Sequence, residues 1–166
     1  MADFDPEEKL QIRPGKCREY LEEFRMTEDG ENFQFNRLAF GNKRIEKLEK
    51  AIEEVKDVLE GQLENNGIPE IKMLECMQKL VKLNLANNKV KGMNIFTVED
   101  SFPNLKWLDV SNNKLVEIPA LKLPKLEYLD MSHNKMEKIN EGWTGHPNVR
   151  IVLCVDNKYK SLAPFK

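Results

Sequence analysis

The segment Leu105-Lys-Trp-Leu-Asp-Val-Ser-Asn-Asn-Lys-Leu115 decides how this chain folds, because two close variants of it occur elsewhere in the sequence. Leu80–Val90 reads Leu-Val-Lys-Leu-Asn-Leu-Ala-Asn-Asn-Lys-Val, and Leu126–Met136 reads Leu-Glu-Tyr-Leu-Asp-Met-Ser-His-Asn-Lys-Met. All three follow the template LxxLxLxxNxL, in which L stands for an apolar residue. Such repetition indicates that the chain is built from stacked copies of one supersecondary unit.

The remaining copies of the template are less regular. Val149–Tyr159 matches it closely, and residues 35–45 and 58–68 match it more weakly. Gly61 is the only residue that is not apolar at a position where the template requires an apolar one, and Lys43 is the only anchor that is not asparagine. The anchors recur every 21 to 25 residues, at Lys43, Asn66, Asn88, Asn113, Asn134 and Asn157.

The template describes a short strand followed by a sharp turn. Within the strand, apolar residues alternate, so that pairs such as Leu108 and Val110 point to the same side. One strand cannot bury this side alone, whereas stacked copies form a continuous parallel sheet with a core behind it. In the turn, the anchor amide carries donors and an acceptor for backbone groups that have no partner in the sheet. The predicted fold class is an α/β solenoid with a curved parallel β-sheet on the concave side and short helical or irregular convex segments.

The connections and the two ends of the chain lead to further predictions. Residues 44–60 carry apolar residues at three- to four-residue spacing and predict a convex helix. The predicted helix overlaps the weak repeat at 58–68. The two predictions are compatible only if the helix ends before residue 60. Residues 1–32 carry no repeat and are expected to form an N-terminal cap or tail, with a short helix at 17–26. Residues 33–166 form the predicted repeat domain of about six repeats, the first two degenerate, with an uncapped C-terminal end.

Composition narrows the class of protein. The chain has 166 residues, a formal net charge of −2 and a sequence pI near 5.8, which argues against nucleic-acid binding. No apolar run approaches the roughly 18 residues of a membrane span, so no membrane partner is expected. The acidic N-terminus is unlike a signal or transit peptide, and three widely spaced cysteines form no disulfide framework or CxxC metal site. These features predict a cytoplasmic protein in a reducing setting.

Catalytic motifs are not apparent in the sequence. It contains no glycine-rich phosphate loop, and its only two histidines, His133 and His146, provide little material for a triad or a metal site. Cys154 falls on a buried position of the template, where a thiol is expected to be inert. The chain is therefore predicted not to be an enzyme, with no catalytic residues, no cofactor and no metal.

The repeats resemble a known superfamily. The chain is similar to the intracellular branch of the leucine-rich repeat proteins, with repeats of about 22 residues. The repeats that carry this resemblance are Leu80–Met93, Leu105–Ile118, Leu126–Ile139 and Val149–Leu162. Gly145–Ile151 and Val155–Leu162 look like repeats of the leucine-rich proteins of ciliary axonemes, particularly those associated with radial spokes. Phosphatase-regulating leucine-rich proteins share much of the same consensus. The resemblance implies a non-enzymatic structural subunit of a large assembly such as the axoneme; the alternative is a soluble regulatory adaptor of an enzyme such as a protein phosphatase.

The template also locates a candidate binding face. Outward strand positions form continuous rows across the concave side, because parallel strands lie about 4.8 Å apart. A protein partner is expected there and at the uncapped C-terminal end, and the candidate residues are Trp107, Asp109, Tyr128, Asp130, Ile151 and Leu153. The aromatic pair has the composition of a binding hot spot.

Three alternatives remain open for these residues. Asp109 and Asp130 are also common fillers of the consensus. The two aromatic side chains could be covered by the protein's own loops. Ile151 and Leu153, which Val155 follows as a third outward apolar residue, would be buried if the last repeat were shifted in register by one residue.

Overall fold

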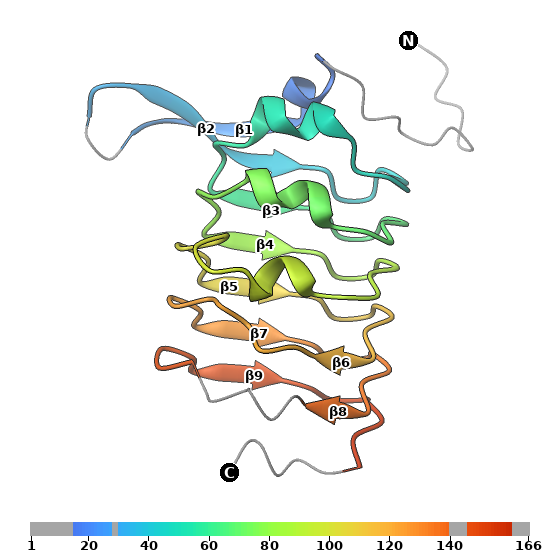
Figure 1. The fold of residues 1–166 in the computed structure, drawn as a ribbon. Coiled ribbons are helices and arrows are strands. Elements are labelled where there is room, and N and C mark those ends of the chain that lie inside the picture. Colours follow the sequence, from blue (N-terminus) through green and yellow to red (C-terminus); the bar gives the residue numbers. More distant parts are fainter. Residues whose placement is uncertain (1–14, 28–29, 140–145, 161–166) are drawn as a thin grey trace.

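A mostly parallel seven-stranded sheet runs the length of the molecule (Figure 1). The computed structural model describes residues 15–27, 30–139 and 146–160. The strand order is β1-β2-β3-β4-β5-β7-β9, with β1 antiparallel to β2 and every later pair parallel. The strands are β1 (Leu21–Met26), β2 (Phe33–Ala39), β3 (Glu60–Gln62), β4 (Lys82–Asn84), β5 (Trp107–Asp109), β7 (Tyr128–Asp130) and β9 (Ile151–Leu153).

Short segments cover one face of this sheet, and 3-10 helices form this cover in the early repeats (Figure 1). They are η2 (Lys50–Val55), η3 (Lys72–Cys76) and η4 (Asn94–Thr97), and η1 (Cys17–Tyr20) precedes β1. In the later repeats β6 (Glu117–Ile118) and β8 (Lys138–Ile139) replace the helices and pair with each other in a second, two-stranded sheet. The predicted solenoid class is confirmed, with a convex side of short helical and extended segments.

The core lies between the sheet and the convex segments. In the repeat anchored at Asn113 the five apolar positions of the template are all fully buried, namely Leu105, Leu108, Val110, Leu115 and Ile118. Fully burying one such side chain contributes about 1.5–3 kcal/mol to folding. The central repeats therefore carry the core that holds the face of the sheet in place.

The anchor asparagines form a continuous hydrogen-bond ladder. Asn113 Oδ1 accepts from the Val90 N–H of the preceding repeat at 2.9 Å, and Asn113 Nδ2 donates to the Leu85 and Val110 carbonyls at 2.9 and 3.1 Å. The same pattern repeats at Asn66, Asn88, Asn134 and Asn157. Each amide thus links its own turn to the preceding one, as the sequence predicted.

The residue before each anchor has a second, conformational role. Asn87, Asn112 and His133 have φ of 55°, 51° and 56°, and Asn42, Asn65 and Asp156 are alike at the equivalent sites. This left-handed backbone turns the chain out of the sheet, and asparagine tolerates it better than most residues. The recurrent Asn-Asn pairs therefore combine a turn residue with a ladder residue.

Two of the helices predicted from the sequence are much shorter in the structure. Of residues 44–60, only η2 is helical, and it is a 3-10 helix; the chain then continues into β3, so 58–68 is a true repeat. Ile45 and Leu48 are buried because they occupy the two apolar positions after the anchor, whose spacing imitates one turn of an α-helix. Of residues 17–26, only η1 is helical, and the rest is β1.

The two ends of the stack depart from the template in burial. Phe35 occupies an apolar template position but is 41% exposed, because in this first repeat it already lies within β2 and alternation turns it outward with Arg37. Cys154 was expected in the core and is only partly buried, since no described strand follows β9 to cover it. The predicted cap or tail at 1–32 is described only in part: η1 and β1 pack on the first repeat, whereas residues 1–14 lie outside the described residues.

Candidate functional site

The sheet presents its other face as two rows of side chains, and this concave face is the candidate site. The register aligns Lys82, Trp107, Tyr128 and Ile151 in one row, preceded by Arg37 and Glu60. The second row contains Asn84, Asp109, Asp130 and Leu153. The two rows have the composition that the template predicted.

A stacked aromatic pair occupies the middle of the first row. The Trp107 and Tyr128 rings are nearly parallel, at 7°, with centroids 5.1 Å apart. Lys82 Nζ lies 4.8 Å from the Trp107 ring centroid on the side away from Tyr128 in the row, which is a cation–π distance. Both aromatic residues are half-buried, so the stack leaves part of each ring available on this face.

The two aspartates of the second row act mainly on their own strands. Asp109 Oδ1 accepts from the Ser111 N–H at 2.8 Å, and Asp130 Oδ1 accepts from the Ser132 N–H at 2.9 Å. Their consensus role is therefore to bind the backbone where the strand ends. Simple alternation would place the two serines on the open face, but they lie past the ends of β5 and β7 and are buried, at 8% and 6% exposure.

The aspartates also affect the neighbouring phenol. Tyr128 Oη donates a long hydrogen bond to Asp130 Oδ2 at 3.5 Å. Burial, followed by the charges of Asp130 and Asp109, raises the pKa of Tyr128 above its ordinary value. The phenol therefore keeps its proton at neutral pH and can act as a donor.

The last strand exposes an apolar patch. Ile151, Leu153 and Val155 are 48%, 38% and 61% exposed. Ile151 pairs with Tyr128 and Leu153 with Asp130, so the alternative of a one-residue register shift is wrong. Residues 161–166, the predicted uncapped end, lie outside the described residues.

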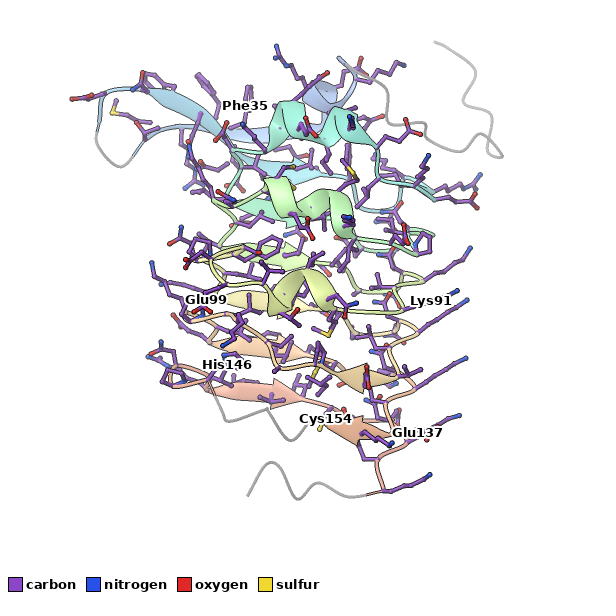
Figure 2. The ribbon with its side chains drawn as sticks, viewed as in Figure 1. Phe35, Lys91, Glu99, Glu137, His146 and Cys154 are labelled. Carbon is purple, nitrogen blue, oxygen red and sulfur yellow. The ribbon has the colours of Figure 1, made fainter. Side chains whose placement is uncertain are left out.

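A further apolar surface was missed by the sequence interpretation. Phe24, Met26, Phe33 and Phe35 are 41–61% exposed and lie on the β1–β2 hairpin, which projects beyond the strands below it (Figure 1). We call these four residues the hairpin cluster. Figure 2 labels Phe35 at this end of the stack, well separated from Cys154 near β9. The alternating Phe-Gln-Phe of residues 33–35 was the available signal, but the repeat template assigned Phe35 to the core.

Charged residues next to the hairpin cluster line a groove of about 650 Å³ between η1 and the first strands of the sheet. Its walls include Glu19, Glu22, Arg37, Lys43 and Glu64. Arg37 bonds to Glu60 at 3.2 Å and also pairs with Glu23, while Lys43 Nζ lies 5.5 Å from the Tyr20 ring centroid. Both basic groups of the groove are thus already engaged.

The remaining polar residues give no catalytic arrangement within the described ranges. His133 Nδ1 lies 2.9 Å from Asp156 Oδ2 in the turns, and burial lowers the pKa of His146. Burial raises the pKa of the Cys17 thiol to about 11, which keeps it protonated.

The described residues contain no group of three or more His, Cys, Asp or Glu that could hold a metal ion. Nor do they include a helix long and apolar enough to span a membrane.

Comparison with known proteins adds a family-level match. A family model described as Leucine Rich repeats (2 copies) matches residues 103–144, the part of the chain that contains β5 to β8. No match was found among curated protein sequences.

Solved structures share the architecture at low sequence identity. An internalin (inlF) from Listeria monocytogenes is 18% identical, with a TM-score of 0.67 over 79% of this chain and 44% of the internalin. The leucine-rich repeat ectodomain of the receptor kinase SOBIR1 from Arabidopsis thaliana is 22% identical, with a TM-score of 0.62 over 82% and 78% of the two chains. The functional domain of InlJ from Listeria monocytogenes is 19% identical, with a TM-score of 0.55 over 77% and 31%.

These similarities concern the fold. The chain spans less than half of each of the two Listeria proteins. The chain has a leucine-rich repeat fold, a class of domain that generally binds proteins through extended concave surfaces.

Proposed function

Because the chain has a leucine-rich repeat fold, we propose that it is a non-enzymatic protein–protein interaction module whose concave face binds a partner around Trp107 and Tyr128. The observation that carries this proposal is the parallel stack of these two rings on the open face of the sheet. Trp and Tyr are enriched among the residues that contribute most to binding free energy. Asp109, Asp130, Ile151 and Leu153 extend the proposed surface along the same rows.

The stack is suited to binding because it is rigid before the partner arrives. Its rings already pack on each other, so little side-chain entropy remains to be lost on association. A partner that covers them removes apolar ring surface from water, and a cationic side chain could approach the ring faces as Lys82 does. The Asp109 and Asp130 carboxylates beside the rings favour such a basic partner.

The test is an affinity pull-down with the full chain and a Trp107→Asp/Tyr128→Asp double variant as baits. We expect the double variant to lose the specific partner while circular dichroism shows an unchanged fold. Val98→Asp is the control, because Val98 is an exposed apolar residue (53%) that lies after η4, away from the rows of the sheet. Equal recovery by all three baits would remove the concave face from consideration.

We further propose that the partner belongs to a large structural assembly such as the ciliary axoneme, with the chain as a structural subunit in the cytoplasm or cilium. Support comes from the resemblance of residues 145–151 and 155–162 to repeats of radial-spoke-associated proteins. The alternative is a soluble regulatory adaptor of an enzyme such as a protein phosphatase.

Fractionation of the source cell separates these two roles. A structural subunit should resist extraction with salt and be stoichiometric with the partner that it pulls down. A regulator should be soluble, and the activity of its partner should change when the chain is added. A soluble chain without stoichiometric partners would contradict the assembly role.

A further inference from the structure

We propose that the hairpin cluster and the adjoining acidic groove bind a basic amphipathic segment of a partner protein, with its apolar side chains on the phenyl rings and a Lys or Arg side chain in the groove. This inference rests on the proposed function, since it extends the concave face by one surface and specifies the chemistry of the partner. Its evidence is separate from the Trp107–Tyr128 stack.

The first observation is the apolar exposure of the hairpin. Phe24, Phe33, Met26 and Phe35 are 61%, 59%, 56% and 41% exposed. The Phe24 ring lies 5.4 Å from the Phe33 ring and 5.0 Å from the Phe35 ring, so the side chains form one contiguous surface. Isolated apolar residues are common on protein surfaces, but a contiguous aromatic cluster normally marks an interface.

The second observation is an acceptor in the groove that no described residue satisfies. Glu64 Oε2 is inaccessible to solvent and accepts no hydrogen bond from the part of the chain that the structure describes. Its carboxylate lies over Gly41, where a Cβ would collide with it, so the glycine makes room for the acid. A buried acceptor without a partner is unfavourable, and a donor from a bound cationic side chain would remove this cost.

Charge determines which occupant fits. Glu19, Glu22 and Glu64 line the groove. Its two basic groups are already engaged, since Arg37 pairs with Glu22, Glu23 and Glu60 and Lys43 lies against the Tyr20 ring. A second copy of this chain, docked symmetrically, would bring the same carboxylates against each other. An anionic membrane would be repelled as well, whereas a basic protein segment complements the groove.

The register of β1 and β2 specifies the spacing in the partner. Phe24 pairs with Phe35 and Glu22 pairs with Arg37, so the aromatic surface and the groove wall are two residues apart on each strand. Two strand residues span about 6.6 Å. The Glu64 carboxylate lies farther along, over Gly41, six residues and up to about 20 Å from Phe35. An extended partner segment therefore needs its basic residue about six positions from its apolar residues to reach Glu64.

The experiment selects a phage-displayed library of random 16-residue peptides against the full chain and measures the affinity of the enriched peptides, made synthetically. We expect them to combine apolar residues with Lys or Arg. Affinity should fall about tenfold or more with the Phe24→Ser/Phe35→Ser variant, and should fall and become less salt-dependent with Glu64→Gln. Val98→Ser is the matched control and should bind normally, and circular dichroism checks that each variant is folded.

Three other outcomes of this experiment would overturn the inference. These outcomes are enriched peptides without basic residues, affinities unchanged by both variants, and no enrichment at all. A concentration-dependent dimer in light scattering that the Phe24→Ser/Phe35→Ser variant abolishes would show that a second copy covers the cluster instead.

A Trp107→Ala variant separates this inference from the proposed function. Peptides sensitive only to Trp107→Ala would support the proposed concave site and refute the hairpin site. Peptides sensitive only to the hairpin and Glu64 variants, together with an unchanged pull-down by the Trp107→Asp/Tyr128→Asp bait, would do the reverse.

Discussion

At the scale of single residues, each turn of the solenoid divides two tasks between neighbouring side chains. In the pair Asn112-Asn113, the first residue takes the left-handed backbone conformation, and the second inserts its amide between successive turns. Asn113 is buried at 7% exposure, whereas Asn112 lies on the surface. The same residue type is therefore repeated for two different physical reasons.

This division predicts a large loss of stability for a substitution at the second site and almost none for one at the first. Asn113→Ala should lower the free energy of unfolding by about 1–3 kcal/mol, because the buried Val90 N–H loses its acceptor. The Leu85 and Val110 carbonyls each lose one of two donors and keep the amide of the neighbouring anchor. Asn112→Gly should change it by less than about 0.5 kcal/mol, because glycine accepts a positive φ. Urea unfolding followed by circular dichroism measures both, and equal effects would contradict the ladder.

His146 gives a prediction for pH dependence. Burial lowers its pKa in the folded chain, outweighing a backbone hydrogen bond with Leu123 that raises it. The unfolded chain then binds the proton more readily, so this contribution to stability is complete above about pH 6.5 and is lost as the pH falls through the lower, folded pKa. His146→Gln should flatten this part of the stability curve, measured as urea midpoints between about pH 7.5 and about pH 5. Parallel curves for the two proteins would refute it.

At the scale of elements, packing between neighbouring strands determines which residues the core accepts. Gly61 is the one buried template position without a side chain, in the middle of β3. A Cβ there would lie 3.1 Å from a Leu63 methyl carbon and 3.1 Å from a Leu83 methyl carbon. The space belonging to this position is therefore already filled by adjacent leucines.

We predict that Gly61→Leu destabilises the fold by about 1–3 kcal/mol, because the consensus residue overpacks this layer. Gly92→Leu is the control, since no atom of the described residues, apart from Gly92 and its chain neighbours, lies within 4 Å of a Cβ built there. Combining Gly61→Leu with Leu83→Ala should recover part of the loss by returning volume to the same layer. Urea midpoints of the four proteins test this, and a Gly61→Leu protein as stable as wild type would contradict it.

At the scale of the whole molecule, each strand depends on the neighbours that stack on it. β4, β5 and β7 have a paired strand on both sides, whereas β1 and β9 are the outermost strands of the sheet in the part of the chain that the structure describes. The central residues Leu83, Leu108 and Leu129 are fully buried, while Val152 in β9 is only partly buried. The binding surfaces proposed above thus combine a rigid centre with less supported ends.

Hydrogen exchange should show this gradient directly. We expect the amides of β4, β5 and β7 to exchange slowest and those of β1 and β9 fastest, because edge strands open without disrupting a second interface. Exchange followed by mass spectrometry measures this across the chain. Uniform protection from β1 to β9 would show that the stack opens only as one unit.

The sequence alone determined the repeating unit, the buried positions of the central repeats, the asparagine ladder and the two rows of the concave face. It could do so because the same local geometry recurs with a constant period, so each copy reports the same environment. Only the tertiary structure decided the ends: Phe35 is exposed, Cys154 is half-buried, and the helices expected at 17–26 and 44–60 are short. A template records that a position is apolar. It does not record that Phe35 lies on the outward face of β2, or that the described residues include no further strand beyond β9 to cover Cys154.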